Sequence, residues 1–569
     1  MKTASTKHKI CLIWEATMRY LKSTVLKIVI ISAGTATLCS GRTPFAEAQA
    51  HIVHFPSNRS MGMLYVLDSN KVDTGGYSDW RPLYEATGDV TVPAGKALRL
   101  DLSKDASKDL SPLRALEPND LTMLFCRGIE ISDDQFEHLS HLTGLQEIYL
   151  EDTGILGTGL KYLVKLKSLK RLDLSNTHVG DNELGYLVGL PSLKDLSLRG
   201  TPTSDAGMVH VGKITSLEAL GLSRGVGDEG LSHLKSLVNL RWLSAGNQGI
   251  TDEGLAHLAS LTQMESLDLR DTQVSDAGLV YLKKMTKLKS LSLYGTRVTE
   301  QGFVHLETLE HLEDLRVLFG VTESGLMALS KLSSLKEITI DGDSITAKGL
   351  AILSKMKSLE HVYVDNTNKM DAIVGQLIKL SHLKALTLGT GLTDEGLTQL
   401  KNMPSLQELT IGPSQITGKG IAALAELPSL KALSLHQMKL ASEGEWASFG
   451  KLYSLQRLTL MHIRSQVTDA HISHLAGLQF LRELSIDTII IRDRNATYFM
   501  DVTDKGIGYI SKLKSLERLS LRGIKITDEG LQQLSEIPSL RWLDLQGCKV
   551  TEQGLQRLKK KLPALHWYL

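Results

Sequence analysis

The chain repeats one short phrase, and this repetition limits its fold more than any other property. ITDEGLAHLASLTQMESLDL, which begins at Ile250, returns as VSDAGLVYLKKMTKLKSLSL at Val274 and as ITDEGLQQLSEIPSLRWLDL at Ile526. The aligned units share the pattern LxxLxLxxT and begin at Leu121, Leu145, Leu169, Leu193, Leu217, Leu240, Met264, Leu288, Leu312, Leu335, Leu359, Leu383, Leu406, Leu430, Leu455, Leu481, Leu516 and Leu540. Most of these 18 units are 24 residues long. A period of this length predicts a solenoid, which grows by adding units.

Each unit contains the signals of one short strand and one helix. In LRWLDLQG, residues 540–547, Leu543 and Leu545 alternate with Trp, Asp and Gln, the period-two pattern of a strand with one buried face. The next words, KVTEQGLQRLKKKLPA, place Leu555 and Leu558 at helical spacing. We therefore predict that a strand is followed by a helix in every unit.

The residues between the strand and the helix predict how the helix begins. Thr551 precedes Glu552, so the hydroxyl is expected to cap the helix while the carboxylate lies at its positive end. Most units place a glycine three residues after this threonine or serine, for example Gly530 and Gly554. We expect this glycine to allow close packing of the first helical turn against the neighbouring repeat.

One strand and one helix cannot bury their own leucines, whereas stacked copies can. The predicted fold is therefore an α/β solenoid shaped like a horseshoe, with a parallel β-sheet on the concave face and helices on the convex face. With neighbouring strands about 4.8 Å apart, 18 strands predict an inner arc of about 80 Å.

The wording LxxLxLxxTxITDxGLxxLxxL resembles exported bacterial leucine-rich-repeat proteins, and the resemblance covers about four-fifths of the chain. It is also similar to the cysteine-containing repeats of F-box substrate receptors. It differs from the latter by having threonine where they usually have Cys or Asn, at Thr153, Thr177, Thr201, Thr272 and Thr296. The resemblance implies a non-catalytic binding scaffold.

The N-terminal residues 1–50 have the layout of an extension with a secretory signal peptide. Three basic residues precede an apolar run at residues 28–38, and small residues follow at Ala46, Ala48 and Ala50. The run of 11 residues is short for a bilayer span. We therefore predict export to the periplasm, the cell surface or the medium. A membrane anchor, a buried helix and a lipid attached at Cys39 are the alternatives.

Residues 51–119 differ from the repeats, which are assigned to residues 120–569. A strand is predicted at 63–67, and GDVTVPAGKALRLDLS, residues 88–103, predicts a hairpin that turns at Pro93 to Gly95. Leu110, Leu113 and Leu116 resemble half of a repeat. The segment is interpreted as a β-rich N-terminal cap over the first leucine layer. A carbohydrate- or wall-binding role is the alternative.

The composition argues against several functions. Lys and Arg total 64 against 63 Asp and Glu, so no basic field favours nucleic acid. Four cysteines without metal-site spacing predict neither a disulfide framework nor a zinc site. Histidines precede a helix leucine in six units, but tyrosine replaces them in others, and a metal site would not tolerate that exchange. No catalytic or phosphate-binding motif stands in a suitable context. We expect no enzyme activity, cofactor or small-molecule substrate.

The outward positions of the strands predict a concave, ordered binding surface. Its candidate residues are Tyr149, Arg171, Arg199, Trp242, Asp268, Arg270, Tyr294, Arg316, Tyr363, Arg457, Arg522 and Trp542. Arginines and aromatic residues dominate the binding energy of interfaces.

A second candidate site is the longest insertion, IIIRDRNATYFMD, residues 489–501. Insertions in a solenoid lie in loops at one rim and often carry binding. The candidate residues are Arg492, Arg494, Tyr498, Phe499 and Met500. The predicted partner is a protein or a surface polysaccharide. The alternative is a cytosolic adaptor of the F-box-receptor type, in ubiquitin-type protein turnover, which requires that the N-terminus is not a signal.

Overall fold

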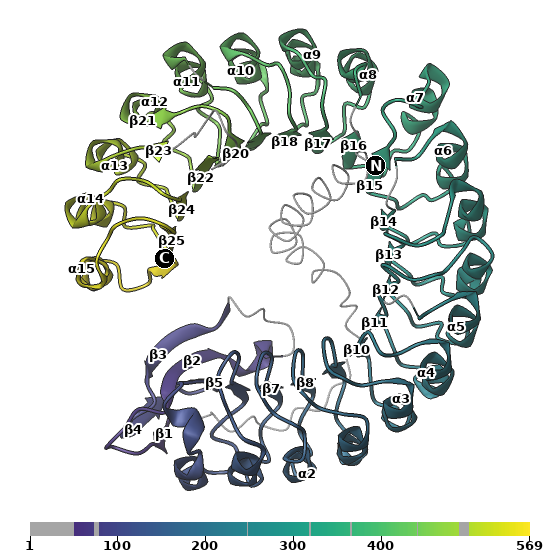
Figure 1. Ribbon diagram of the computed structural model, residues 1–569, viewed down its shortest axis with the longest axis vertical. Helices are drawn as coiled ribbons and strands as arrows, with labels where there is room; N and C mark the ends of the chain where they lie inside the picture. The colour runs from purple at the N-terminus through teal and green to yellow at the C-terminus, as the bar shows by residue number, and fades with distance from the viewer. Residues whose placement is uncertain are drawn as a thin grey trace, which may run out of the picture. The chain divides into compact units, whose positions relative to one another are not determined.

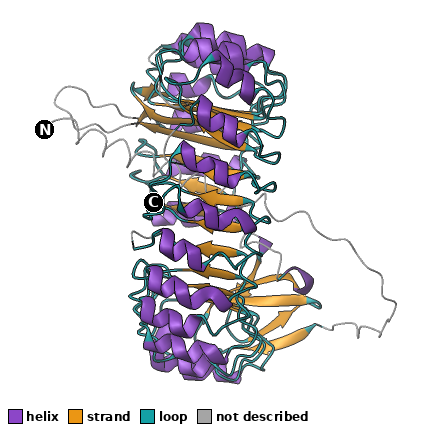
Figure 2. Cartoon of the chain, turned by 90° about the vertical axis from the view of Figure 1, so that its right-hand side faces the viewer, coloured by secondary structure: helices purple, strands orange, loops and turns teal. Residues whose placement is uncertain are grey.

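The computed structural model of the chain describes residues 50–72, 79–246, 249–317, 320–364, 367–440, 442–488 and 500–568. Apart from Ala50, the predicted signal segment lies outside these residues. The chain forms two compact units, Met1–Leu240 (the N-terminal unit) and Arg241–Leu569 (the C-terminal unit). Within each unit, the strands of the repeats lie side by side and the helices cover one side of them (Figure 1, Figure 2). Each unit is therefore a stretch of α/β solenoid.

The N-terminal unit begins with longer strands and continues with short ones. Its strands are β1 (His51–His54), β2 (Gly62–Asp68), β3 (Arg81–Glu85), β4 (Asp89–Val92), β5 (Lys96–Leu102), β6 (Met123–Phe125), β7 (Glu147–Tyr149), β8 (Arg171–Asp173), β9 (Asp195–Ser197) and β10 (Ala219–Gly221). Its helices are η1 (Ser69–Lys71), η3 (Ala106–Lys108), η4 (Ser111–Ala115), η5 (Asp133–Leu139), α2 (Leu160–Leu163), η6 (Asn182–Gly189), α3 (Asp205–Val211), α4 (Asp228–Ser232) and η7 (His233–Ser236), where η marks 3-10 helices.

The predicted hairpin of residues 88–103 is wrong, although both of its strands exist. β4 pairs antiparallel with β1, whereas β5 pairs antiparallel with β2 and parallel with β6. The turn between them is present, since the Lys96 N–H donates to the Pro93 carbonyl at 3.3 Å. The turn therefore separates two sheets. The antiparallel segment, residues 51–102, contains β1 to β5, and β5 connects it to the parallel sheet of the repeats. β6 to β10 continue that sheet with parallel pairing.

The C-terminal unit consists of repeats. Its strands are β11 (Trp242–Ser244), β12 (Ser266–Asp268), β13 (Ser290–Ser292), β14 (Asp314–Arg316), β15 (Glu337–Ile340), β16 (His361–Val364), β17 (Ala385–Leu388), β18 (Glu408–Ile411), β19 (Ala432–His436), β20 (Arg457–Ile463), β21 (Val467–Thr468), β22 (Glu483–Thr488), β23 (Met500–Asp501), β24 (Arg518–Leu521), β25 (Trp542–Asp544) and β26 (His566–Tyr568). β11 to β20 pair in parallel, each with the next, and β22, β24, β25 and β26 continue the sheet. β21 and β23 form a separate parallel pair.

The helices of the C-terminal unit are short. They are α5 (Asp252–His257), η8 (Gly278–Lys284), η9 (Glu300–Leu306), α6 (Glu323–Leu329), α7 (Ala347–Leu353), α8 (Met370–Leu377), α9 (Asp394–Gln399), η10 (Leu400–Asn402), α10 (Gly418–Ala423), η11 (Leu424–Glu426), α11 (Glu443–Phe449), α12 (Asp469–Ser473), α13 (Asp504–Ile510), α14 (Asp528–Gln533), η12 (Leu534–Glu536) and α15 (Glu552–Lys561). Several repeats thus form 3-10 rather than α-helix, a conformation restricted to short pieces. None of the helices in the described ranges has both the length and the apolar character needed to cross a membrane.

The leucines of the repeated pattern form the core. Leu267, Leu291 and Leu315 are buried and occupy equivalent positions on β12, β13 and β14. The threonine that ends the pattern donates its hydroxyl to the carbonyl three residues earlier, as Thr272 does to Leu269 at 2.8 Å. Thr153 makes the same bond to Leu150 at 2.7 Å. The threonine therefore satisfies a carbonyl at the end of the strand, where no further ladder bond is available.

In several repeats, the start of the helix is hydrogen-bonded to the preceding repeat. Thr551 caps α15, as predicted, by accepting the Gly554 N–H at 3.0 Å. Its own N–H and hydroxyl donate to the two oxygens of Asp528 in the preceding helix, at 2.9 and 2.6 Å. The same pair of bonds joins Thr527 to Asp504 in the C-terminal unit and Ser204 to Asp181 in the N-terminal unit. The threonine or serine that recurs at this position therefore bonds to the preceding repeat as well as capping its own helix.

Candidate partner-binding face

The candidate site is the strand face, defined as the outward side chains that alternate with the buried leucines of the strands. In the repeat that starts at Met264, these outward residues are Ser266, Asp268 and Arg270, while Leu267 and Leu269 point into the core. Because the strands pair in register, outward residues at equivalent positions form rows across the sheet. Neighbours in a row are about 24 residues apart in the sequence.

In the N-terminal unit, Tyr149 and Arg171 belong to one hydrogen-bonded group. The Tyr149 hydroxyl donates to Glu147 at 2.8 Å, and Arg171 donates to that hydroxyl at 3.1 Å and to Glu147 at 3.2 Å. Arg171 also donates to Asp195 at 2.8 Å. Burial raises the pKa of Tyr149 above its ordinary range. These predicted residues are thus brought together and held in place by the carboxylates of Glu147 on β7 and Asp195 on β9.

The antiparallel segment lies against the first part of this face. Trp80 and Val72 are buried in a cluster against which Tyr65 and Tyr149 pack. The guanidinium of Arg99, a residue only 1% exposed, lies 4.5 Å from the Tyr65 ring centre and 5.1 Å from that of Phe125. Tyr149 is therefore in part a packing residue, which reduces the surface that it can offer to a partner.

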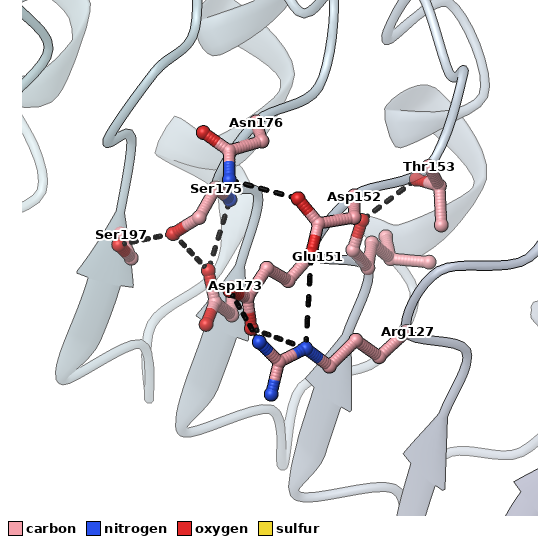
Figure 3. A network of polar contacts seen from close by, with 9 residues as sticks. Arg127, Glu151, Asp152, Thr153, Asp173, Ser175, Asn176 and Ser197 are labelled. Carbon is pink, nitrogen blue, oxygen red and sulfur yellow. Dashed lines mark hydrogen bonds and ion pairs between the residues drawn. The ribbon is translucent and has the colours of Figure 1, made fainter. Parts of the chain in front are cut away.

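A polar network crosses the ends of β7, β8 and β9 (Figure 3). Arg127 forms an ion pair with Glu151 at 3.1 Å, and the Asn176 amide donates to Asp152 at 2.8 Å. Burial raises the pKa of Glu151, and the neighbouring Asp173 adds to the shift.

Two serines complete this network. The Ser175 hydroxyl donates to Asp173 at 2.5 Å and lies 2.7 Å from the Ser197 hydroxyl (Figure 3). The predicted residue Arg199 is exposed. Its side chain lies next to Gly221 of β10, since a Cβ added to that glycine would be 3.4 Å from the Arg199 Cγ.

In the C-terminal unit, two arginine–aspartate pairs flank Ser292. Arg270 donates to Asp268 at 2.7 and 2.9 Å, and Arg316 pairs with Asp314 at 2.7 Å. The side chains of Arg270 and Arg316 keep exposures of 39% and 36%. Ser292, on the strand between them, is buried, and its hydroxyl has no hydrogen-bond partner among the described residues. The arginines are therefore oriented before any ligand arrives.

A carboxyl and two aromatic rings follow on β15 and β16. Burial raises the pKa of Glu337 to about 7, and the nearby Asp314 adds to the shift. The rings of His361 and Tyr363 stack with centres 4.0 Å apart. Burial lowers the pKa of His361 to about 4, and its Nε2 lies 3.1 Å from the Thr387 hydroxyl. At neutral pH this part of the face thus combines a neutral imidazole with a carboxyl that is only partly ionised.

The raised pKa of Glu337 predicts how pH affects stability. Since the pKa in the folded chain exceeds the ordinary value of 4.5, ionisation of Glu337 penalises folding. The penalty is absent below pH 4.5 and complete above about pH 7. In thermal melts across this range, the Glu337→Gln variant should gain stability relative to the parent as pH rises. A difference that is constant or shrinks with rising pH would contradict the assignment.

The remaining predicted residues of the strand face are spread over the C-terminal unit. Arg457 pairs with Glu408 at 2.5 Å, and Arg522 pairs with the buried Asp544 at 2.8 Å. Trp542 and Trp242 each carry an arginine near the ring, Arg518 at 5.5 Å and Arg241 at 5.0 Å. Trp242 is 42% exposed. The structure thus places these residues on one face but not in a single cluster.

The insertion is described only at its end. Arg492, Arg494, Tyr498 and Phe499 lie outside the described residues, so their proposed role stays a prediction. Met500 was expected to contact a partner, and this is wrong because it is 1% exposed. It lies on β23, paired with Val467 of β21, and contributes to the core of the stack.

One feature of the face was not predicted from the sequence. The residues that directly precede successive strands form a row in which positive and negative side chains alternate. Glu265 lies between Arg241 and Lys289 and pairs with Lys289 at 2.9 Å. Further along the row, Glu360 pairs with Lys384 at 2.7 Å. The signal was present as a sign change at one fixed repeat position. Within the described ranges, no group of three or more His, Cys, Asp and Glu residues is placed to hold a metal ion.

Comparisons with known proteins agree with this architecture. Residues 208–448 match a family model described as a leucine-rich repeat region. Among solved structures, the chain is similar to a TLR13–ssRNA13 complex, with 19% identity, a TM-score of 0.45, and coverage of 79% of this chain and 67% of that one. A search of curated proteins gives no match.

Two bacterial structures are also similar to the chain. A leucine-rich-repeat protein of Leptospira interrogans has 18% identity and a TM-score of 0.31, with 79% and 96% of the two chains covered. An internalin from Listeria monocytogenes has 18% identity and a TM-score of 0.25, with 72% and 93% covered. Since these TM-scores are below 0.5, the identification depends on the family model and on the stacked strand-and-helix units of the LxxLxLxxT pattern. On these grounds the chain is a leucine-rich-repeat protein.

Proposed function

We propose that this protein is an exported, non-catalytic scaffold that binds a protein partner through the strand face of its C-terminal unit. The observation that carries the proposal is the pair of oriented, part-exposed arginines on β12 and β14, with Tyr294 and Tyr363 on the same face. Arginine and tyrosine contribute most to interface energy when they are already ordered, because little entropy is then lost on binding.

A protein is favoured over a polysaccharide as the partner. The aspartates leave part of each guanidinium exposed, so further N–H donors remain for a carboxylate or a carbonyl of a partner. The ring of Tyr363, by contrast, is half-buried and stacks on His361. Export is supported by the signal-like residues 1–50. An N-terminus that stays uncleaved would instead favour the cytosolic adaptor.

The binding proposal can be tested with two tyrosine variants. Tyr294 lies on the strand face, whereas Tyr281 lies on the helix η8 of the preceding repeat and is 38% exposed. A partner captured with the mature protein and then purified should bind the Tyr294→Ala variant at least tenfold more weakly, which corresponds to about 1.4 kcal/mol. The Tyr281→Ala variant should bind as the parent does. If both variants bind equally, or only Tyr281→Ala is impaired, the strand face is not the partner site.

A further inference from the structure

The C-terminal unit has a hollow of about 320 Å³ on its strand face, where β18, β19, β20, β22 and β24 begin. The first residue of β19, Ala432, has a short outward side chain. The neighbouring outward residues are Glu408 on β18 and Arg457 on β20. Arg457 reaches across the space above Ala432 to pair with Glu408 at 2.5 Å. The hollow is thus a gap in the row, closed on one side by an ion pair.

The lining of the hollow is entirely polar and has no net charge. It consists of three cationic side chains, three carboxylates and the amides of Gln407 and Gln456. Two of the charged pairs are satisfied within the sheet: Arg457 with Glu408, and Arg482 with Glu517 at 3.0 Å.

The remaining cation and anion are Lys431 and Glu483. The side chain of neither residue makes a hydrogen bond or an ion pair with another residue of the described part of the chain. Lys431 directly precedes β19 and Glu483 begins β22, so their backbones are two strand spacings apart, about 10 Å. The lining of the hollow therefore includes one ammonium and one carboxylate that have no side-chain partner in the described part of the chain.

We propose that this hollow binds a small zwitterion of the α-amino-acid class. The ligand's carboxylate would pair with Lys431 and its ammonium with Glu483. Each end of the ligand would form a charge-assisted hydrogen bond of about 2.8 Å. A small molecule that carries both an ammonium and a carboxylate is complementary in charge to these two side chains. The two glutamine amides can donate to and accept from the ligand's polar atoms.

Other ligand classes fit the lining less well. An apolar molecule would find no apolar side chain to displace water from. A polyanion would meet three carboxylates, and a simple cation would meet three cationic groups. A sugar ring would find no aromatic side chain in the lining to pack on. Because the lining groups are part-exposed, we expect binding to weaken as salt concentration rises.

Calorimetric titration of the full chain with glycine, L-serine and L-glutamine tests the proposal. N-acetylglycinamide, which carries neither charge, serves as the ligand control. The zwitterions should bind and the neutral compound should not. Glu483→Gln and Lys431→Met should each weaken binding at least tenfold, with unchanged melting temperatures that show intact folding. The matched variants Glu360→Gln and Lys384→Met, in a charge pair outside the hollow, should bind as the parent does.

The proposal would be overturned by no saturation by any zwitterion at about 10 mM, or by equal binding of N-acetylglycinamide. Binding that is insensitive to both pocket variants would also overturn it. The site is separate from Arg270, Tyr294 and Arg316, so its failure would leave the partner-binding proposal intact. Conversely, loss of the protein partner in the Tyr294→Ala variant would not affect the titration.

Discussion

Replacing Leu291 with alanine should destabilise the C-terminal unit by about 2–5 kcal/mol. Leu291 is fully buried and lies in register with Leu267 and Leu315 on the neighbouring strands. Truncation removes buried methyl groups and leaves a cavity that the rigid stack can fill only in part. Because each repeat packs mainly against its neighbours, the loss should be concentrated in three layers.

Hydrogen exchange of backbone amides measures this distribution. We expect faster exchange on β12, β13 and β14 and little change near α14 and α15. The matched control is Leu156→Ala, since Leu156 is 60% exposed and should change stability by less than about 0.5 kcal/mol. A uniform rise of exchange through the whole C-terminal unit would show that its repeats unfold as one block, contrary to the nearest-neighbour expectation.

The Gly530→Ala substitution should cost about 1–3 kcal/mol, the usual range for overpacking a tight contact. A Cβ at this position would lie 2.0 Å from Asp504 Oδ1 and 3.2 Å from the Asp504 Cα. The carboxylate would have to move, yet it accepts both the N–H and the hydroxyl of Thr527. The substitution therefore adds a steric clash and breaks two hydrogen bonds that join neighbouring repeats.

Gly477 provides a matched control for this variant. It is exposed, and a Cβ there would meet no atom within 4 Å. Gly477→Ala should thus change the denaturation midpoint very little, whereas Gly530→Ala should lower it clearly. Should both variants melt alike, the repeated glycine would be a matter of helix propensity and not of contact between repeats.

Most of the repeat architecture could be predicted because its signals are local and recur. The strand alternation around Leu543 and Leu545, the cap at Thr551 and the close packing at Gly554 all agree with the structure. The hairpin of residues 88–103 failed for a different reason. Alternating apolar residues predict that a segment is a strand, but β4 and β5 choose their partners by contacts with β1, β2 and β6, which the segment itself does not contain.

The candidate site could be predicted only in outline. Outward positions follow from the alternation, so Arg270, Tyr294 and Arg316 were placed on one face. Their different environments did not follow, since the pKa of Glu337 and the burial of Ser292 depend on neighbours from other repeats. Met500 was predicted to be exposed because it lies in an insertion. It is buried because its strand, β23, pairs with β21 of the preceding repeat.

The sequence by itself determined the period, the strand and helix of each repeat and the direction of each leucine. These properties depend on residues within one unit of about 24, and repetition makes them unambiguous. Only the tertiary structure decided which charges meet. Lys431 and Glu483 stand 52 positions apart in the chain, yet stacking brings both into the lining of one hollow. Coulombic and hydrogen-bonding contacts require distances of a few ångström, and those distances exist only after the repeats have stacked.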